Sequence, residues 1–164
     1  MTPGIMTPGI MTPGIMTPGI TTHGTGMDGI AWNILGQTYV PLQRSEASMS
    51  WHATFPPGTF VPPHAHATQD EFVYVLTGTL EADLVGDTGV DTQVAGPGDL
   101  IRLPMHGAHG LFNRSGATVT CLFWVAPTGQ LWDLFTAIDG VPDPAEIVRL
   151  AALHDVDFLP PSAS

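Results

Sequence analysis

Short apolar segments separated by glycine and proline dominate the chain from residue 30 to residue 126. Apolar and polar positions alternate within several of them, as in MSWHATF at 49–55, which is typical of strands buried on one face. Turn signals between them are PPG at 56–58, TG at 77–78, GDTG at 86–89, GPGD at 96–99 and NRSG at 113–116. Strands are predicted at 30–35, 49–55, 71–76, 79–85, 93–94, 100–103 and 118–125. No segment here has the period of a helix, so an all-β sandwich or barrel is indicated.

The pattern changes after Pro127. Asp143 suits an N-cap, Pro144 the first helical position and Glu146 the third, and the apolar residues that follow recur at helical spacing. An amphipathic helix is therefore predicted from about residue 144, and residues 129–138 are a candidate for a shorter one. We divide the chain into an arm at 1–24, a β-barrel at 25–127 and a C-terminal helical extension at 128–164 that packs on the barrel.

The first twenty residues are four perfect copies of MTPGI, followed by the degenerate remnant TTHG. Each copy has a Pro-Gly pair, which is typical of a turn, so a turn-rich, low-complexity arm is predicted rather than a packed element. Two interpretations stay open: an arm that docks on a neighbouring subunit, and a simple expansion of the repeat. We favour the second.

Charge and composition narrow the classes of partner. The chain has 164 residues, with 15 acidic residues against four arginines, no lysine and a net charge of −11. Such a charge repels phosphate groups, so nucleic-acid and membrane partners are not expected. The start shows no signal peptide, and no stretch approaches the ~20 apolar residues of a membrane span, so a soluble, cytoplasmic protein is expected. The single cysteine, Cys121, lies in an apolar run and is interpreted as a core residue.

Candidate chemistry lies in two stretches. His64 and His66 are one residue apart in an extended segment, so their side chains leave the same face, and Glu71 opens the next strand. A buried carboxylate is costly unless a cation or hydrogen bonds compensate it. His109 lies in a second stretch, 98–113, that could return beside the first. Three imidazoles and one carboxylate suit a divalent transition metal such as iron, manganese, nickel, copper or zinc.

These stretches resemble the two motifs of the cupin superfamily. The first motif is matched at every defined position: Gly58, His64, His66, Glu71 and Gly78. The second is matched at Gly98, Pro104, His109 and Asn113. Where the family usually has glycine, this chain has His106, followed by Gly107. One expectation is therefore that the turn is displaced by one position.

The resemblance implies a double-stranded β-helix, a small jelly-roll barrel, with one or two C-terminal α-helices added here. It also implies that His64, His66, Glu71 and His109 bind one metal ion inside the barrel, and that two chains form a homodimer. The alternative is a metal-free member in which these residues are hydrogen-bonded polar groups of the core.

Other residues have weaker claims to a role. His106 is a candidate catalytic acid or base, because histidine titrates near neutral pH, against the alternative of an exposed turn residue. His52 enters the cavity only if its face of the strand is the inner one. Tyr74 is expected to pack, and Arg102 to form a surface ion pair. Three aromatic residues could frame a substrate mouth but are more often core: Trp124, Trp132 and Phe135.

Three functions fit a metal in an apolar barrel, because this fold hosts many activities. The main hypothesis is a dioxygenase-type oxidoreductase acting on a small enolic or phenolic substrate, with Glu71 as ligand or as acceptor of the substrate proton. Similar single-domain cupins are often described as quercetin-dioxygenase-like. The second is a non-redox isomerase, cyclase, lyase or dehydratase in which the metal acts as a Lewis acid. The third is a small-molecule-binding cupin without turnover.

Overall fold

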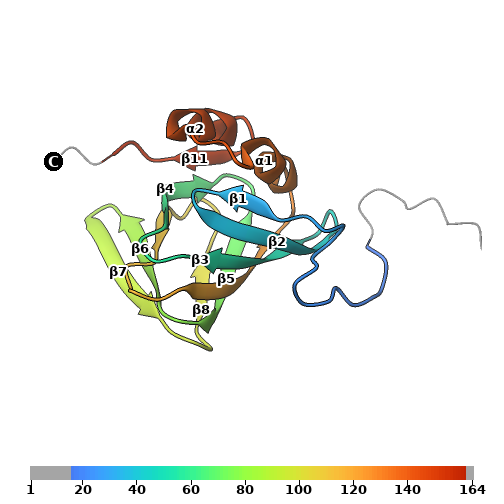
Figure 1. Cartoon of the computed structure of the whole chain (residues 1–164). Coiled ribbons are helices and arrows are strands. Elements are labelled where there is room, and N and C mark those ends of the chain that lie inside the picture. The colour runs from blue at the N-terminus through green and yellow to red at the C-terminus, as the bar shows by residue number, and fades with distance from the viewer. Residues whose placement is uncertain (1–15, 162–164) are drawn as a thin grey trace, which may run out of the picture.

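Two antiparallel sheets face each other and form a jelly-roll barrel (Figure 1). The structure, a computed structural model, describes residues 16–161. The first sheet has the order β1 (Trp32–Ile34), β2 (Gln37–Arg44), β3 (Met49–Phe55), β10 (Val119–Ala126), β5 (Asp70–Thr77) and β8 (Leu100–Leu103). The second has the order β11 (Val156–Phe158), β4 (Phe60–His66), β9 (His109–Phe112), β6 (Leu80–Gly86) and β7 (Gly89–Ala95). The predicted all-β jelly-roll class is confirmed.

Alternation along the strands directs one set of side chains into the barrel. In β3 and β10 every second residue is buried, as expected for strands with one inner face. The inner face holds an aromatic cluster, in which Trp51 stacks on Phe123 with ring centroids 5.2 Å apart and Tyr39 lies 5.3 Å from Phe135. The barrel interior is therefore mostly apolar.

The motif glycines lie where the backbone requires them. Gly78 has φ +78° between β5 and β6, and a Cβ there would lie 2.9 Å from a methyl group of Val119. Gly58 has φ +80° in the turn before β4. Both conformations are accessible to glycine at little cost.

The C-terminal extension covers one end of the barrel. It consists of α1 (Leu131–Ile138), α2 (Pro144–Ala152) and β11, which lie together above that end in Figure 1. The predicted N-cap of α2 is confirmed, because the side chain of Asp143 accepts a hydrogen bond from the backbone N–H of Ala145 at 3.0 Å. Within residues 16–161 no helix has the length and apolar character needed to cross a membrane.

The last strand of the described chain joins the second sheet. β11 pairs antiparallel with β4, and the register places Val156 opposite His66 and Phe158 opposite His64. The extension is thus part of the barrel wall as well as its cover, because its last strand completes the edge beside the two histidines.

Candidate metal centre

Strand β4 presents two histidines to the barrel interior. His64 and His66 are separated by one residue, so both point inward, and their exposed fractions are 5% and 4%. The two prolines before them, Pro62 and Pro63, stand where the pairing of β4 with β9 shifts register between Val61 and His64. Proline is tolerated at such an irregularity because no ladder hydrogen bond is lost.

Two neighbouring strands bring the remaining members of the cluster. Glu71 lies near the start of β5 and is 4% exposed, and His109 opens β9 and is 1% exposed. His109 lies directly opposite His64 in the pairing of β4 and β9. Glu71 and His109, which are 38 positions apart in sequence, come into contact because β5 and β9 flank the same part of the barrel interior.

The four side chains form one compact cluster. Each of His64, His66, Glu71 and His109 offers one ligand atom, and these atoms all lie within 4.8 Å of one another. The Glu71 Oε2 atom lies 3.1 Å from His109 Nε2 and 3.4 Å from His66 Nε2. The structure thus brings together all the residues that the resemblance implies as ligands.

In His64 and His109, a hydrogen bond at Nδ1 leaves Nε2, the nitrogen that faces the cluster, without a proton when the ring is neutral. His64 Nδ1 donates to the Pro62 carbonyl at 2.8 Å, and His109 Nδ1 donates to the Gly107 carbonyl at 2.9 Å. A carbonyl oxygen only accepts, so Nδ1 carries the proton and Nε2 of the neutral ring presents a lone pair. This is the usual second contact of a metal-binding histidine.

Burial and mutual contacts set the charges of the cluster. Burial alone would raise the pKa of Glu71, but the neighbouring imidazoles of His66 and His109 hold it well below its ordinary value. Burial would lower the pKa of His66, but the Glu71 carboxylate raises it above its ordinary value. Burial, reinforced by the neighbouring His109, lowers the pKa of His64 to about 3. The cluster therefore contains an anionic carboxylate beside a neutral imidazole.

The donor set fits a transition-metal ion. His66 Nε2 is buried and has no hydrogen-bond partner, and lone pairs that face each other across 3.1–3.4 Å repel unless a proton or a cation lies between them. Two donors ~2.1 Å from one ion would be about 3.0–3.4 Å apart, as these are. Nitrogen donors with one carboxylate suit the first-row divalent metals and zinc.

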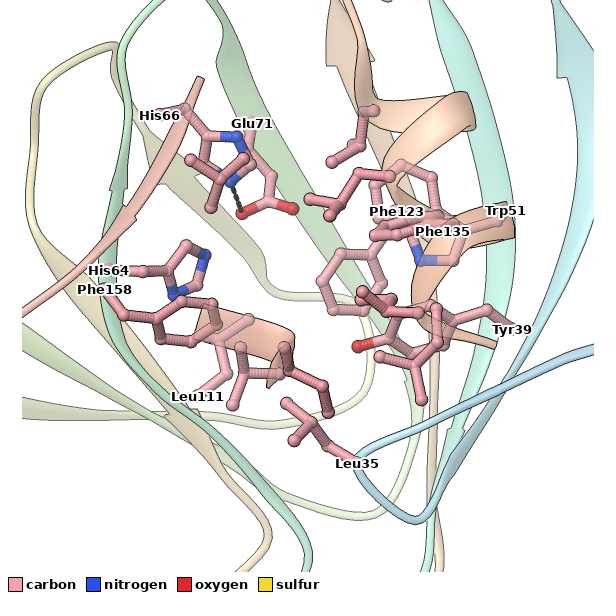
Figure 2. A pocket seen from close by; sticks show the side chains of 17 residues that line it. Leu35, Tyr39, Trp51, His64, His66, Glu71, Leu111, Phe123, Phe135 and Phe158 are labelled. Carbon is pink, nitrogen blue, oxygen red and sulfur yellow. Dashed lines mark ion pairs between the residues drawn. The ribbon is translucent and has the colours of Figure 1, made fainter. Parts of the chain in front are cut away.

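An apolar cavity opens on the cluster. Figure 2 shows His64, His66 and Glu71 on one side and the aromatic rings of Trp51 and Phe123 on the other. The wall is completed by β1, β2, β4, β9 and the turn between β1 and β2, through Ile34, Leu35, Tyr39, Val61 and Leu111. The C-terminal extension contributes Leu131, Leu134, Phe135, Ile138, Ile147, Val156 and Phe158. His109 belongs to the cluster but does not line this cavity.

The cavity is small, and no arginine of the described residues lines it. Its volume is about 50 Å³, whereas ordinary ligand pockets have about 300–1,000 Å³. Outside the cluster, Tyr39 and Trp51 are lining residues with a polar atom: the Tyr39 hydroxyl donates to Gln37 Oε1 at 2.7 Å, and Trp51 Nε1 is buried without a hydrogen-bond partner. None of the arginines in residues 16–161 lines the cavity.

His106 lies outside the site. Its side chain is exposed and does not line the cavity, and its backbone N–H donates to the His66 carbonyl at 2.9 Å. The expectation that the turn shifts to Gly107 is wrong, because His106 itself has φ 67° and Gly107 does not have positive φ. Histidine tolerates this left-handed conformation better than most residues do, so the motif turn is kept in place.

The remaining candidates lie in several places. His52 is on the outer face of β3, because Trp51 and Phe55 point inward, and its ring lies 6.3 Å from that of His23. Tyr74 points away from Val73 and Val75, as expected, and lies 39% exposed on the outer face of β5, outside the cavity. Arg102 is exposed and forms no ion pair within the described part of the chain, contrary to expectation.

The three aromatic candidates lie in three different places relative to the cavity. Phe135 lines the cavity and contacts Trp51, with ring centroids 5.1 Å apart. Trp132 packs on Trp32 at 4.9 Å, behind the cavity wall. Trp124 stacks on Phe72 at 5.3 Å, and both alternate with inward-pointing neighbours, so they lie on the outer face of the first sheet. Only Phe135 of the three contacts the cavity, and it belongs to its cover.

Sequence reasoning missed one buried polar residue beside the cluster. Gln69 is 2% exposed, and its Oε1 lies 3.1 Å from His66 Nδ1. A signal was available, because Gln69 precedes Glu71 by two positions and so shares its face of an extended chain. A glutamine has no preferred side of a sheet, so spacing alone does not mark it as buried.

The jelly-roll barrel and the inward-pointing cluster of histidines and glutamate place the protein in the class of double-stranded β-helix proteins with a candidate metal site inside the barrel. Residues 51–125 match the family model of the cupin domain, and the chain accordingly carries a cupin domain. No curated protein matches the chain.

Solved structures share the fold. An RmlC-like cupin from Shewanella frigidimarina is 18% identical, with a TM-score of 0.60, and the match covers 71% of this chain and 96% of that one. KdgF from Halomonas sp. is 24% identical, with a TM-score of 0.51, and the match covers 56% of this chain and 79% of that one. At these identities the likeness concerns the fold alone.

Proposed function

We propose that the protein is a metal-dependent oxidoreductase of the dioxygenase type, acting on a small enolic or phenolic substrate. The observation that carries the proposal is the cluster itself. The ligand atoms of three imidazoles and a carboxylate lie within 4.8 Å of one another, and His64, His66 and Glu71 line an apolar cavity. Such a site lets a ligand oxygen approach the donors while the walls exclude water.

The residues of the cluster have two proposed roles: to hold the ion and to accept a proton from the substrate. His64, His66, Glu71 and His109 would hold one divalent transition metal, which supplies Lewis acidity and, if redox-active, a route for electrons from substrate to O₂. The Glu71 carboxylate is the candidate acceptor for the proton of a substrate hydroxyl, because it is buried and lines the cavity beside the position proposed for the ion. His64 stays neutral at physiological pH and so remains a donor of lone pairs.

Size and charge restrict the substrate. A phosphorylated or dicarboxylic ligand would need a cationic partner besides the ion, and no arginine lines the cavity. A flavonol does not fit in about 50 Å³ unless the C-terminal extension moves. A compact diketone or a simple phenol, uncharged until it loses one proton, matches both limits.

Elemental analysis of protein purified without a chelating tag is the first test, followed by oxygen uptake with pentane-2,4-dione, catechol and a flavonol. Stoichiometric iron, copper, nickel or manganese with uptake on a small substrate would support the proposal. Turnover without oxygen uptake would assign the site to non-redox chemistry by the same carboxylate. Tight ligand binding without any product would leave a binding protein.

We also propose that two chains form a homodimer. The support is the outer face of the first sheet, where Tyr74, Leu76 and Leu100 are 39%, 40% and 43% exposed. Contiguous exposed apolar residues mark candidate interfaces. Light scattering after size-exclusion chromatography would test this, and a monomer at micromolar concentration would contradict it.

A further inference from the structure

Gln69 connects a candidate metal ligand to the cover of the cavity. Its side chain is buried, and its Oε1 lies 3.1 Å from His66 Nδ1. On its other side Nε2 donates to two backbone carbonyls, that of Pro127 at 3.0 Å and that of Thr128 at 2.5 Å. Both protons of the amide and its oxygen are thus engaged.

These contacts fix the orientation of the amide and, through it, the proton of His66. Two carbonyl oxygens can only accept, so the –NH₂ end of Gln69 must face Pro127 and Thr128. The oxygen end must then face His66, whose Nδ1 has to be the donor. Nε2 of the neutral ring is left with its lone pair directed at the cluster, where it has no hydrogen-bond partner.

The same amide is attached to the point where the cover begins. The Thr128 carbonyl also accepts from the backbone N–H of Leu131, the first residue of α1. Thr128 is itself tied to the barrel, because its hydroxyl donates to the Ser45 carbonyl and its N–H donates to the Glu46 carbonyl at 3.1 Å. A displacement of α1 that carries Thr128 with it would break the contacts that orient Gln69.

We propose that Gln69 is a positioning residue with two roles: it holds His66 in the tautomer that binds a metal, and it couples this ligand to closure of the C-terminal extension. The inference rests on the proposed metal centre. Metal binding and closure stabilise each other, since a coupling between two sites acts equally in both directions. An extension that opens for a substrate thereby loosens one ligand, and a bound ion favours the closed cavity.

Co²⁺ binding and amide hydrogen exchange, measured on the full chain, test both roles. In the wild type, Co²⁺ is expected to slow exchange in α1. Gln69→Leu removes every polar contact, so the Co²⁺ dissociation constant is expected to rise about 10–100-fold, and saturating Co²⁺ no longer slows α1. Gln69→Glu keeps an acceptor for His66 but places a carboxylate against two carbonyls. Its Co²⁺ affinity is therefore expected to stay within about threefold of the wild type, while α1 exchanges faster.

Gln130→Leu is the matched control. Gln130 also lies at the start of the extension, but its amide donates to Asp155 at 2.8 Å and does not reach His66. Its loss should leave Co²⁺ affinity unchanged. Normal Co²⁺ affinity and an unchanged metal effect on α1 in Gln69→Leu would overturn the inference while the metal centre stands. A wild type that binds no Co²⁺ would overturn the metal centre itself. If Gln69→Leu does not fold, Gln69→Glu still tests the inference. Faster exchange of α1 with nearly unchanged Co²⁺ affinity would support it, and a change in both quantities, or in neither, would count against it.

Discussion

The turn at His106 allows the backbone and the chemistry of the motif to be separated in one experiment. His106 has φ 67° and an exposed side chain, so its replacement removes no core contact. Its N–H, which donates to the His66 carbonyl, is retained by glycine and by alanine. The variants His106→Gly and His106→Ala differ only in Cβ, which is the atom that makes the left-handed conformation unfavourable.

The expected difference can be worked from that geometry. A side-chain-bearing residue in the left-handed conformation costs about 1–2 kcal/mol, whereas glycine loses about 0.5–1 kcal/mol more than alanine through its freedom in the unfolded chain. The glycine variant should therefore be the more stable by about 0.5–1 kcal/mol. That corresponds to a rise in Tm of roughly 1–4 °C for a chain of this size.

Urea unfolding of both variants in EDTA measures the difference, and the neighbouring position provides the control. Met105 has no positive φ and is partly exposed, so alanine should be more stable than glycine there. An alanine variant at His106 that matches or exceeds the glycine variant would refute the assigned backbone. Loss of metal or of turnover in either His106 variant would show that His106 has a catalytic or metal-binding role, although its side chain does not line the cavity.

Further expectations concern the ligands and the arm. His109→Ala should abolish stoichiometric metal binding without changing the far-ultraviolet circular dichroism, and full occupancy by elemental analysis would show that the ligand set is wrong. Glu71→Gln keeps the shape but removes the charge, so we expect at least about tenfold weaker metal binding and a larger loss of turnover than of stability. The folded protein keeps His64 neutral down to a pKa of about 3, whereas the unfolded chain takes up this proton near pH 6.5. Lowering the pH from 7.5 to 5 should therefore cost the metal-free wild type about 2 kcal/mol more than His64→Ala, and equal losses in urea titrations would contradict this. Deleting residues 1–20 should leave metal content and Tm nearly unchanged, because Ile20, the last residue of the repeat, is 92% exposed; a large fall in Tm would make the repeat a structural arm.

The sequence predicted the barrel well where burial imposes alternation. The strand at 49–55 was predicted with its observed bounds, because its inner residues are all buried. Strand β2 was missed, since Pro41 interrupts it; the proline lies where the pairing with β3 shifts register. Strand β7 was predicted only at 93–94, because it lies at the edge of its sheet and is exposed along most of its length, which leaves no apolar pattern to detect.

The candidate site was predictable in its ligands but not in its enclosure. Motif spacing places the four side chains of the cluster, because strand pairing converts spacing into proximity. The cover could not be read in the same way, since Phe135 and Ile147 look like the apolar face of any amphipathic helix. Gln69 shows the same limit: its role depends on Pro127 and Thr128, and no local pattern records a contact across 58 or 59 residues.

The pairing of β11 with β4 has a consequence for biosynthesis. The ribosome makes β4 long before Val156 exists, so the outer edge of β4 has no neighbour while most of the chain is being made. An unpaired edge recruits strands from other chains. β11 therefore protects the edge of the ligand-bearing strand, and we expect chains in which β11 has not yet been made to be the most prone to aggregation.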